Sequence, residues 1–473
     1  MKRNNKPYII SFFLLATLFA GACKKDFLDQ KPYTSVPSVD AVNTAPDMQI
    51  ALTGTYAGLR GYLIYGRTIP VFGDILADNL FVSAANSGRY LSFNSYTIVV
   101  DDADISGFWT NSYSTILRAN NIINASLNTG DDVKQYKGEA YAIRALVNFN
   151  LVRSFGKPYT EDPASPGIPL VVSYDPKALP ARNTVEEVYT QILSDLDQAY
   201  NSISTYKGTA TISKYAALSL SAKVNLYKGD YQKAFTQAKE VITQSGFSLV
   251  NRADLVAYWI TATPQGAGSK TETLFEVVSD AVNNNGANEL AAIFSQQGSA
   301  YGDLLTTRSL YELYGNDDVR KKLIVVGVRP KIGGENPAFI VNKYPVVTGD
   351  YNDKKVIRLS EVYLIAAEAA YRLGQTSEAL NYLNTLVAQR DASLRYTVTG
   401  PQLLQDIIKE RRKELAFEGD RFYDLNRLKT DIERTSESPT GPIKYGDYRR
   451  VLPIPQSEIN VNPNVKQNLG YTK

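Results

Sequence analysis

Seven charged residues in the C-terminal third have side chains of the types that acid–base chemistry requires. They are Arg358, Glu361, Glu368, Glu410, Arg411, Glu414 and Arg421. Two carboxyl groups can hydrolyse a glycosidic bond, one as the acid and the other as nucleophile or base. The i, i+3 and i+4 spacings within this set are also those at which opposite charges pair along one helix. We therefore expect these residues to support a helical scaffold, with a carboxylate glycoside hydrolase as the alternative.

The histidine and cysteine counts exclude most other catalytic sites. The chain has no histidine, so neither a Ser-His-Asp triad nor a histidine-ligated zinc site can form. Its single cysteine, Cys23, rules out a disulfide within the chain. We expect no enzyme activity and no cofactor or metal site, although a calcium site built from oxygen ligands remains open.

The residues before Cys23 have the layout of an export signal. Lys2, Arg3 and Lys6 precede an apolar run over 8–20, which is too short to span a bilayer. The small residues 20–22 and the cysteine after them resemble the lipobox of bacterial lipoproteins. That resemblance implies that residues 1–22 are a signal peptide and that Cys23 carries the lipid, palmitate included. An ordinary signal peptidase site, leaving Cys23 as a free thiol, is the alternative.

Removal of the signal peptide changes the charge balance. The full chain has 51 Lys and Arg against 48 Asp and Glu, and three of these bases precede Cys23, so the remainder is formally neutral. This balance gives no indication of a nucleic-acid partner. Residues 23–46 are polar and proline-containing, and we expect them to form a lipidated tether.

Helical patterns dominate the chain after the tether. Thr184 and Glu187 form a capping box, and Val185, Val188, Ile192, Leu196 and Ala199 then recur on one helix face. Pro401 begins another expected helix. Two stretches match at identical offsets, with Gly229 and Gly374 at the turns. Each predicts a helix–turn–helix hairpin similar to a tetratricopeptide repeat.

The segment 251–350 lacks the helical patterns of the stretches described above. It contains the asparagine-rich run 283–288 and two β-branched stretches, 274–278 and 324–328, that predict short strands. Irregular polar loops on a rigid scaffold are a usual place for binding residues. We therefore expect a mainly α-helical fold, with a helical-repeat scaffold and an irregular C-terminal part that contains a few short strands.

Several blocks in fixed order resemble the SusD/RagB family of outer-membrane lipoproteins. In chain order they are Phe108-Trp109, Gly138-Glu-Ala-Tyr-Ala-Ile-Arg144, Gly167-Ile-Pro-Leu170, Arg358-Leu-Ser-Glu-Val-Tyr-Leu-Ile365, Glu410-Arg-Arg-Lys-Glu414, Arg421-Phe-Tyr-Asp-Leu425 and Leu452-Pro-Ile-Pro455. The resemblance covers the whole chain after the signal peptide. It implies an N-terminal helical region over 47–250 and a SusD/RagB C-terminal region over 251–473.

The resemblance also implies a function. Such proteins lie on the outer membrane, facing the cell exterior, and bind a nutrient oligosaccharide that they deliver to a TonB-dependent SusC-like transporter. A peptide-binding RagB-type relative is the nearest alternative. A repeat scaffold that binds only proteins is an alternative of another class.

Candidate ligand residues lie in two polar segments. In similar proteins the first segment contributes to the binding face, and both combine aromatic rings with amide, carboxylate or guanidinium groups, as sugar recognition requires. The candidates are Asp78, Asn79, Asn86, Arg89, Tyr90, Trp259, Asn284 and Tyr301. Phe108 and Trp109 lie in a helix-like block, and we expect them in the core.

Overall fold

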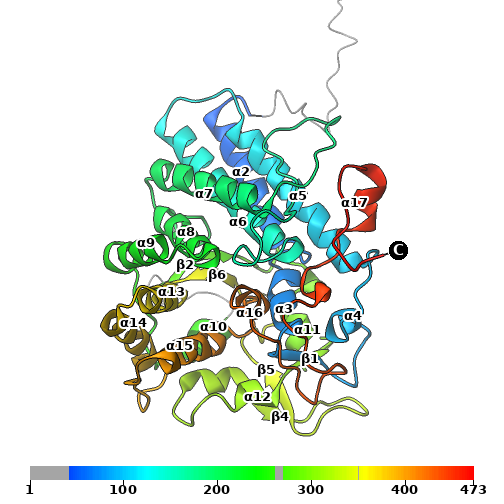
Figure 1. Ribbon diagram of the computed structural model, residues 1–473, viewed down its shortest axis with the longest axis vertical. Helices are drawn as coiled ribbons and strands as arrows, with labels where there is room; N and C mark the ends of the chain where they lie inside the picture. Colours follow the sequence, from blue (N-terminus) through cyan, green and yellow to red (C-terminus); the bar gives the residue numbers. More distant parts are fainter. Residues whose placement is uncertain (1–41, 262–269, 350, 473) are drawn as a thin grey trace, which may run out of the picture.

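Long helices form the N-terminal half of the computed structural model, which describes residues 42–261, 270–349 and 351–472 (Figure 1). The predicted signal peptide, Cys23 and most of the predicted tether lie outside the described residues. The helices of this half are α2 (Ala45–Arg60), α3 (Thr68–Ile75), α4 (Leu91–Asn94), α5 (Ala103–Ile123), α6 (Asp131–Phe155), α7 (Val185–Ser202), α8 (Lys214–Lys228) and α9 (Tyr231–Gln244).

The predicted capping box at the start of α7 is confirmed. The Thr184 side chain accepts a hydrogen bond from the Glu187 amide, and the Glu187 carboxylate accepts one from the Thr184 amide. Both bonds satisfy amides that a helix start leaves without an intrahelical partner. The five apolar positions predicted to share one face of α7 are all buried. Phe108 and Trp109 are also buried, as expected.

The two predicted hairpins are present, and they lie side by side. The first is α8–α9; the second is α13 (Leu359–Arg372) with α14 (Thr376–Ala388). Gly229 and Gly374 have positive φ angles of 85° and 76°, which a turn directly after a helix requires. Helix α9 packs against α13, so the hairpins stack although a long segment separates them in sequence (Figure 1). The repeat scaffold therefore crosses the expected boundary at residue 250.

Short strands and helices form the part between and after the hairpins, and one further strand, β1, precedes both hairpins in the chain. Three two-stranded antiparallel sheets are present in the described residues, and they include both predicted strands. Their strands are β1 (Leu80–Val82) with β3 (Leu304–Thr306), β2 (Thr273–Val277) with β6 (Lys354–Arg358), and β4 (Ile324–Gly327) with β5 (Ala338–Val341). The helices are α10 (Leu255–Ile260), η4 (Gly286–Asn288), α11 (Leu290–Phe294), α12 (Arg308–Tyr311), η5 (Val319–Leu323), α15 (Pro401–Glu414), α16 (Arg421–Arg427), η6 (Tyr448–Arg450) and α17 (Gln456–Val461).

Across the described residues, no helix combines the length and the apolar character that crossing a bilayer requires. Nearly all of the buried apolar side chains form one continuous core that joins the helical and the irregular parts.

Helix α3 meets the turn before α16 with backbone against backbone. A Cβ atom added to Gly73 would lie 1.9 Å from the carbonyl oxygen of Gly419. The Gly419 amide donates to the Asp74 carboxylate at 2.9 Å, and Gly419 has a φ of 86°. Because neither backbone can withdraw without breaking that hydrogen bond, both glycines are required here.

Replacement of Gly73 by alanine tests this contact. We expect Gly73→Ala to lower the free energy of unfolding by about 3 kcal/mol, since overpacking against backbone cannot be relieved by a side-chain movement. Gly54→Ala is the matched control, because nothing lies within 4 Å of a Cβ atom there and α2 should become slightly more stable. Urea unfolding of both variants measures the difference, and equal midpoints would contradict the close approach.

Candidate functional site

The first candidate site is a buried cluster around Glu414, the last residue of α15. Its carboxylate contacts the guanidinium groups of Arg320, Arg358 and Arg390 at 2.9–3.0 Å. These arginines come from η5, from the end of β6 and from the turn after α14. The full Glu414 cluster, which has five cations and five anions, is Glu272, Asp318, Arg320, Lys343, Arg358, Arg390, Glu410, Lys413, Glu414 and Glu418.

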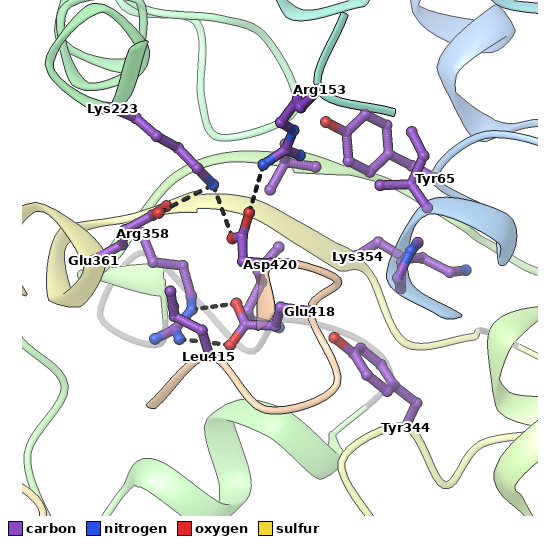
Figure 2. Close-up of a pocket in the computed structure, with 14 residues that line it drawn as sticks. Tyr65, Arg153, Lys223, Tyr344, Lys354, Arg358, Glu361, Leu415, Glu418 and Asp420 are labelled. Atoms are coloured by element: carbon purple, nitrogen blue, oxygen red, sulfur yellow. Dashed lines mark hydrogen bonds and ion pairs between the residues drawn. The ribbon is translucent and has the colours of Figure 1, made fainter. Parts of the chain in front are cut away.

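A second buried cluster surrounds Asp420. Arg153 of α6 and Lys223 of α8 both bind its carboxylate at 2.8 Å, and Figure 2 shows the two side chains converging on it. The buried members of the Asp420 cluster, four cations and four anions, are Arg153, Lys223, Glu361, Glu368, Arg411, Asp420, Asp424 and Arg427. The cluster connects the N-terminal helices to α13, α15 and α16.

Neither cluster is suited to hold a substrate. A cavity of about 20 Å³ lies between them, lined by Arg358, Lys223 and Asp420 among others (Figure 2). That volume accommodates about one water molecule, whereas small-molecule sites occupy about 300–1,000 Å³. Burial would by itself raise the pKa of Glu414, but the three guanidinium groups hold it well below its ordinary value. A carboxylate with such a low pKa is a poor proton donor near neutral pH.

The structural interpretation of the seven charged residues is therefore supported, but their expected pairing was wrong. Arg358 does not pair with Glu361 one helical turn away; it binds Glu414, and Glu361 binds Arg411. The partners come from different elements because six of these seven charges are buried in the core, all but the partly exposed Arg421, and neighbours along one helix cannot surround a buried charge.

Three of the eight predicted ligand residues are buried near α3 and β1. Asp78 binds the Arg421 guanidinium through both of its oxygens at 2.8 Å. Asn79 donates its side-chain amide to Asp74 and has no exposed surface. Tyr90 packs its ring edge-on against Phe72. Their polar groups and rings thus hold this region together from inside.

Trp259 is also buried, with 2% of its surface exposed. Three cations lie against its ring: the amines of Lys343 and Lys355, at 3.9 and 4.8 Å from the ring centre, and the guanidinium of Arg358 at 5.0 Å. Burial lowers the pKa of Lys343 to about 8, although Glu418 opposes the shift. The indole therefore stabilises buried cations of the core.

The remaining four candidates reach the surface, and two of them meet. The guanidinium carbon of Arg89 lies 3.5 Å from the centre of the Tyr301 ring. We call this pair the Arg89–Tyr301 site. Asn86 shapes the loop before Arg89, accepting a hydrogen bond from the Gly88 amide at 2.8 Å. Asn284 similarly accepts one from the Gly286 amide at 2.9 Å and belongs to a separate turn.

Arg329 holds the two loops of the Arg89–Tyr301 site, and it is not among the residues predicted from the sequence. Its buried guanidinium donates to the carbonyl oxygens of Ala85, Tyr301 and Gly302 and, at 2.8 Å, to the side chain of Gln296. The Arg89 loop follows β1 and the Tyr301 loop precedes β3, so the pairing of these strands also brings them together. The one feature of the sequence that could have indicated Arg329 is its position directly after the strand predicted over 324–328.

Removal of the charge at position 414 tests the Glu414 cluster. We expect Glu414→Gln to lower the free energy of unfolding by about 3–5 kcal/mol, because it leaves buried guanidinium groups without their carboxylate. Glu312→Gln is the matched control, since Glu312 is exposed and pairs with Arg308 at 3.6 Å; its effect should stay below about 0.5 kcal/mol. Urea unfolding at pH 7 compares the two, and similar losses would show that the cluster contributes little.

Comparisons with known proteins agree with this architecture. Residues 338–471 match a family model described as the SusD family, and residues 26–226 match one described as "Starch-binding associating with outer membrane". SusD-like protein P2 of Formosa agariphila is 28% identical, and the alignment covers 98% of this chain and all of that protein.

Two solved structures extend the comparison to the fold. A SusD superfamily protein from Bacteroides thetaiotaomicron is 32% identical with a TM-score of 0.83, over 90% of this chain and 100% of the other. A putative sugar binding protein from Bacteroides vulgatus is 30% identical with a TM-score of 0.81, over 91% and 100%. With a mainly helical fold, stacked repeat hairpins and these relatives along nearly its whole length, the chain belongs to the SusD family.

Proposed function

We propose that this protein binds a nutrient oligosaccharide at the cell surface, without chemical conversion, and passes it to a TonB-dependent SusC-like transporter. The observation that carries the proposal is the Arg89–Tyr301 site: a surface aromatic ring and a guanidinium group held together by a buried arginine. The description of one matching family model as starch-binding supports the ligand class. So does the 30% identical relative described as a sugar binding protein.

The geometry of the site suits a sugar. Arg89 covers one face of the partly buried Tyr301 ring, so a pyranose would pack its apolar face against the other side of the ring or its edge. The guanidinium group would donate in a fixed fork to neighbouring hydroxyl groups. Because Arg329 fixes both loops from below, little ordering is needed on binding, and a smaller entropic cost favours affinity. Asp303 adds to this order by accepting a hydrogen bond from the Ser87 amide at 3.0 Å.

Substitution of either partner tests the ligand site. We expect Arg89→Ala and Tyr301→Ala each to weaken the binding of an oligosaccharide by about tenfold or more, as loss of a stacked ring or a charged donor predicts. Arg372→Ala is the matched control, because Arg372 also lies over a tyrosine, at 5.5 Å, but on the repeat scaffold. Calorimetric titration with a panel of oligosaccharides and peptides measures the change. Binding of peptides alone would favour the peptide-binding alternative.

The proposed function includes attachment through lipid on Cys23, with the protein facing the cell exterior. Helix α2 begins at Ala45, capped by Thr44, so about 20 residues separate the anchor from the folded body. At full extension they span at most about 75 Å. A tether of this length lets the folded body stay near a transporter and still move relative to the transporter. One acyl chain binds membranes only marginally, so we propose that several chains are attached.

Loss of the thiol tests the anchor. We expect Cys23→Ala to release the protein from the membrane fraction while its affinity for the ligand stays within about twofold of wild type, because the substitution changes no residue of the Arg89–Tyr301 site. Fractionation followed by titration of the released protein measures both properties. Unchanged membrane retention of the variant would overturn the lipid attachment.

A further inference from the structure

A second cavity, of about 690 Å³, lies on the repeat scaffold and shares no residue with the Arg89–Tyr301 site. It is formed where α7 and α9 end and α8 begins, and we call it the scaffold groove. In Figure 1, α8 and α9 lie at the left of the view, whereas β1 and α4, which flank the Arg89 loop, lie at the lower right. The volume of the scaffold groove is within the range of small-molecule sites, unlike the volume of the cavity between the two charge clusters.

Aromatic rings form one wall of the scaffold groove. Tyr206 is 56% exposed, and its ring meets that of Phe247 edge-to-face at a centroid distance of 5.8 Å. Tyr215, in the first turn of α8, adds a third ring to the lining. A large tyrosine ring held by a neighbour and open to solvent supplies the flat apolar surface on which a sugar ring packs.

Hydroxyl groups and helix ends supply the polar part of the groove. Six further lining residues have hydroxyl side chains, namely Ser204, Thr205, Thr209, Ser213, Ser245 and Thr271. The last turns of α7 and α9 end here, and helix ends leave carbonyl oxygens without intrahelical partners. The combination of rings, hydroxyl groups and carbonyl oxygens matches a ligand with an apolar face and many hydroxyl groups.

A buried acceptor below the groove lacks a partner. Glu276 is 1% exposed; its Oε1 accepts a hydrogen bond from Thr209 at 2.5 Å and contacts the Lys270 amine. Both of these residues line the groove. Its Oε2 has no hydrogen-bond partner within the described part of the chain. Because Glu276 is buried beneath Thr209 and Lys270 and does not itself line the groove, it holds these two lining residues in place and does not reach a ligand.

We propose that the scaffold groove is a second saccharide site, which binds a short oligosaccharide segment through Tyr206 and Phe247. This inference rests on the proposed function for its class of ligand, an oligosaccharide, but places it at a separate site on the molecule. Two sites on one chain hold a long polysaccharide at two points, so the second contact forms at high effective concentration. The groove then retains polymer near the cell independently of the Arg89–Tyr301 site.

Titration calorimetry of the full-length protein tests the proposal with four probes: maltohexaose, cellohexaose, laminarihexaose and xylohexaose. We expect at least one probe to occupy two sites on the wild type. Tyr206→Ala should abolish one of them or weaken it at least about tenfold, while Tyr206→Phe, which keeps the ring, retains it. Tyr174→Ala is the matched control, since Tyr174 is 57% exposed and lies outside the groove.

The outcomes separate the two sites. One outcome is a single binding site that Arg89→Ala removes and Tyr206→Ala leaves unchanged. This result would overturn the proposal for the scaffold groove and leave the proposed function intact. Loss of binding in Tyr206→Ala alone would support the groove and contradict the Arg89–Tyr301 site. Absence of binding by all four probes, or equal weakening by Tyr206→Ala and Tyr174→Ala, would also overturn the groove proposal.

Discussion

Charge neutralisation inside the core is the constraint on which the rest of this structure depends. A guanidinium or carboxylate group that is buried alone costs several kcal/mol, so each one must meet opposite charges at hydrogen-bonding distance. Glu414 meets three arginines, and each of these comes from a different element. A shift of any one element by a few ångströms would leave a buried charge unpaired. The two clusters therefore fix how the irregular C-terminal part lies on the helical scaffold.

The same constraint extends to the surface. Arg421 follows directly after Asp420, and it holds Asp78 just before β1, the strand that leads into the Arg89 loop. The opposite loop is held by Arg329 through carbonyl oxygens. Charged groups of the core thus determine where Arg89 and Tyr301 lie. The Arg89–Tyr301 site is ordered because its supports are bonded within the core.

Sequence patterns predicted the local structure well and the long-range contacts poorly. The α7 face, both glycine turns and the strands near 274 and 324 depend on neighbours within a few residues, which periodicity and capping report. The partners of Glu414 and Asp78 lie far away in the sequence, and no local pattern carries that information. Asp78, Asn79 and Trp259 have side chains suited to ligands, but their burial depends on tertiary packing. The contact between Arg89 and Tyr301 required the β1–β3 pairing, which neither strand indicates alone.

The stacking of α9 on α13 has a consequence for how this scaffold can diversify. The two helices are neighbours in space, so the segment between them leaves and re-enters the repeat stack at adjacent points, as an inserted domain does. Such an insertion could be exchanged if its replacement reproduced the contacts that it makes with the rest of the core. The exchange has a charge condition here, because Glu272, Asp318, Arg320, Lys343 and Arg358 lie within the inserted segment and all belong to the Glu414 cluster. A replacement must supply two acids and three bases at equivalent places, together with a strand that pairs with β1.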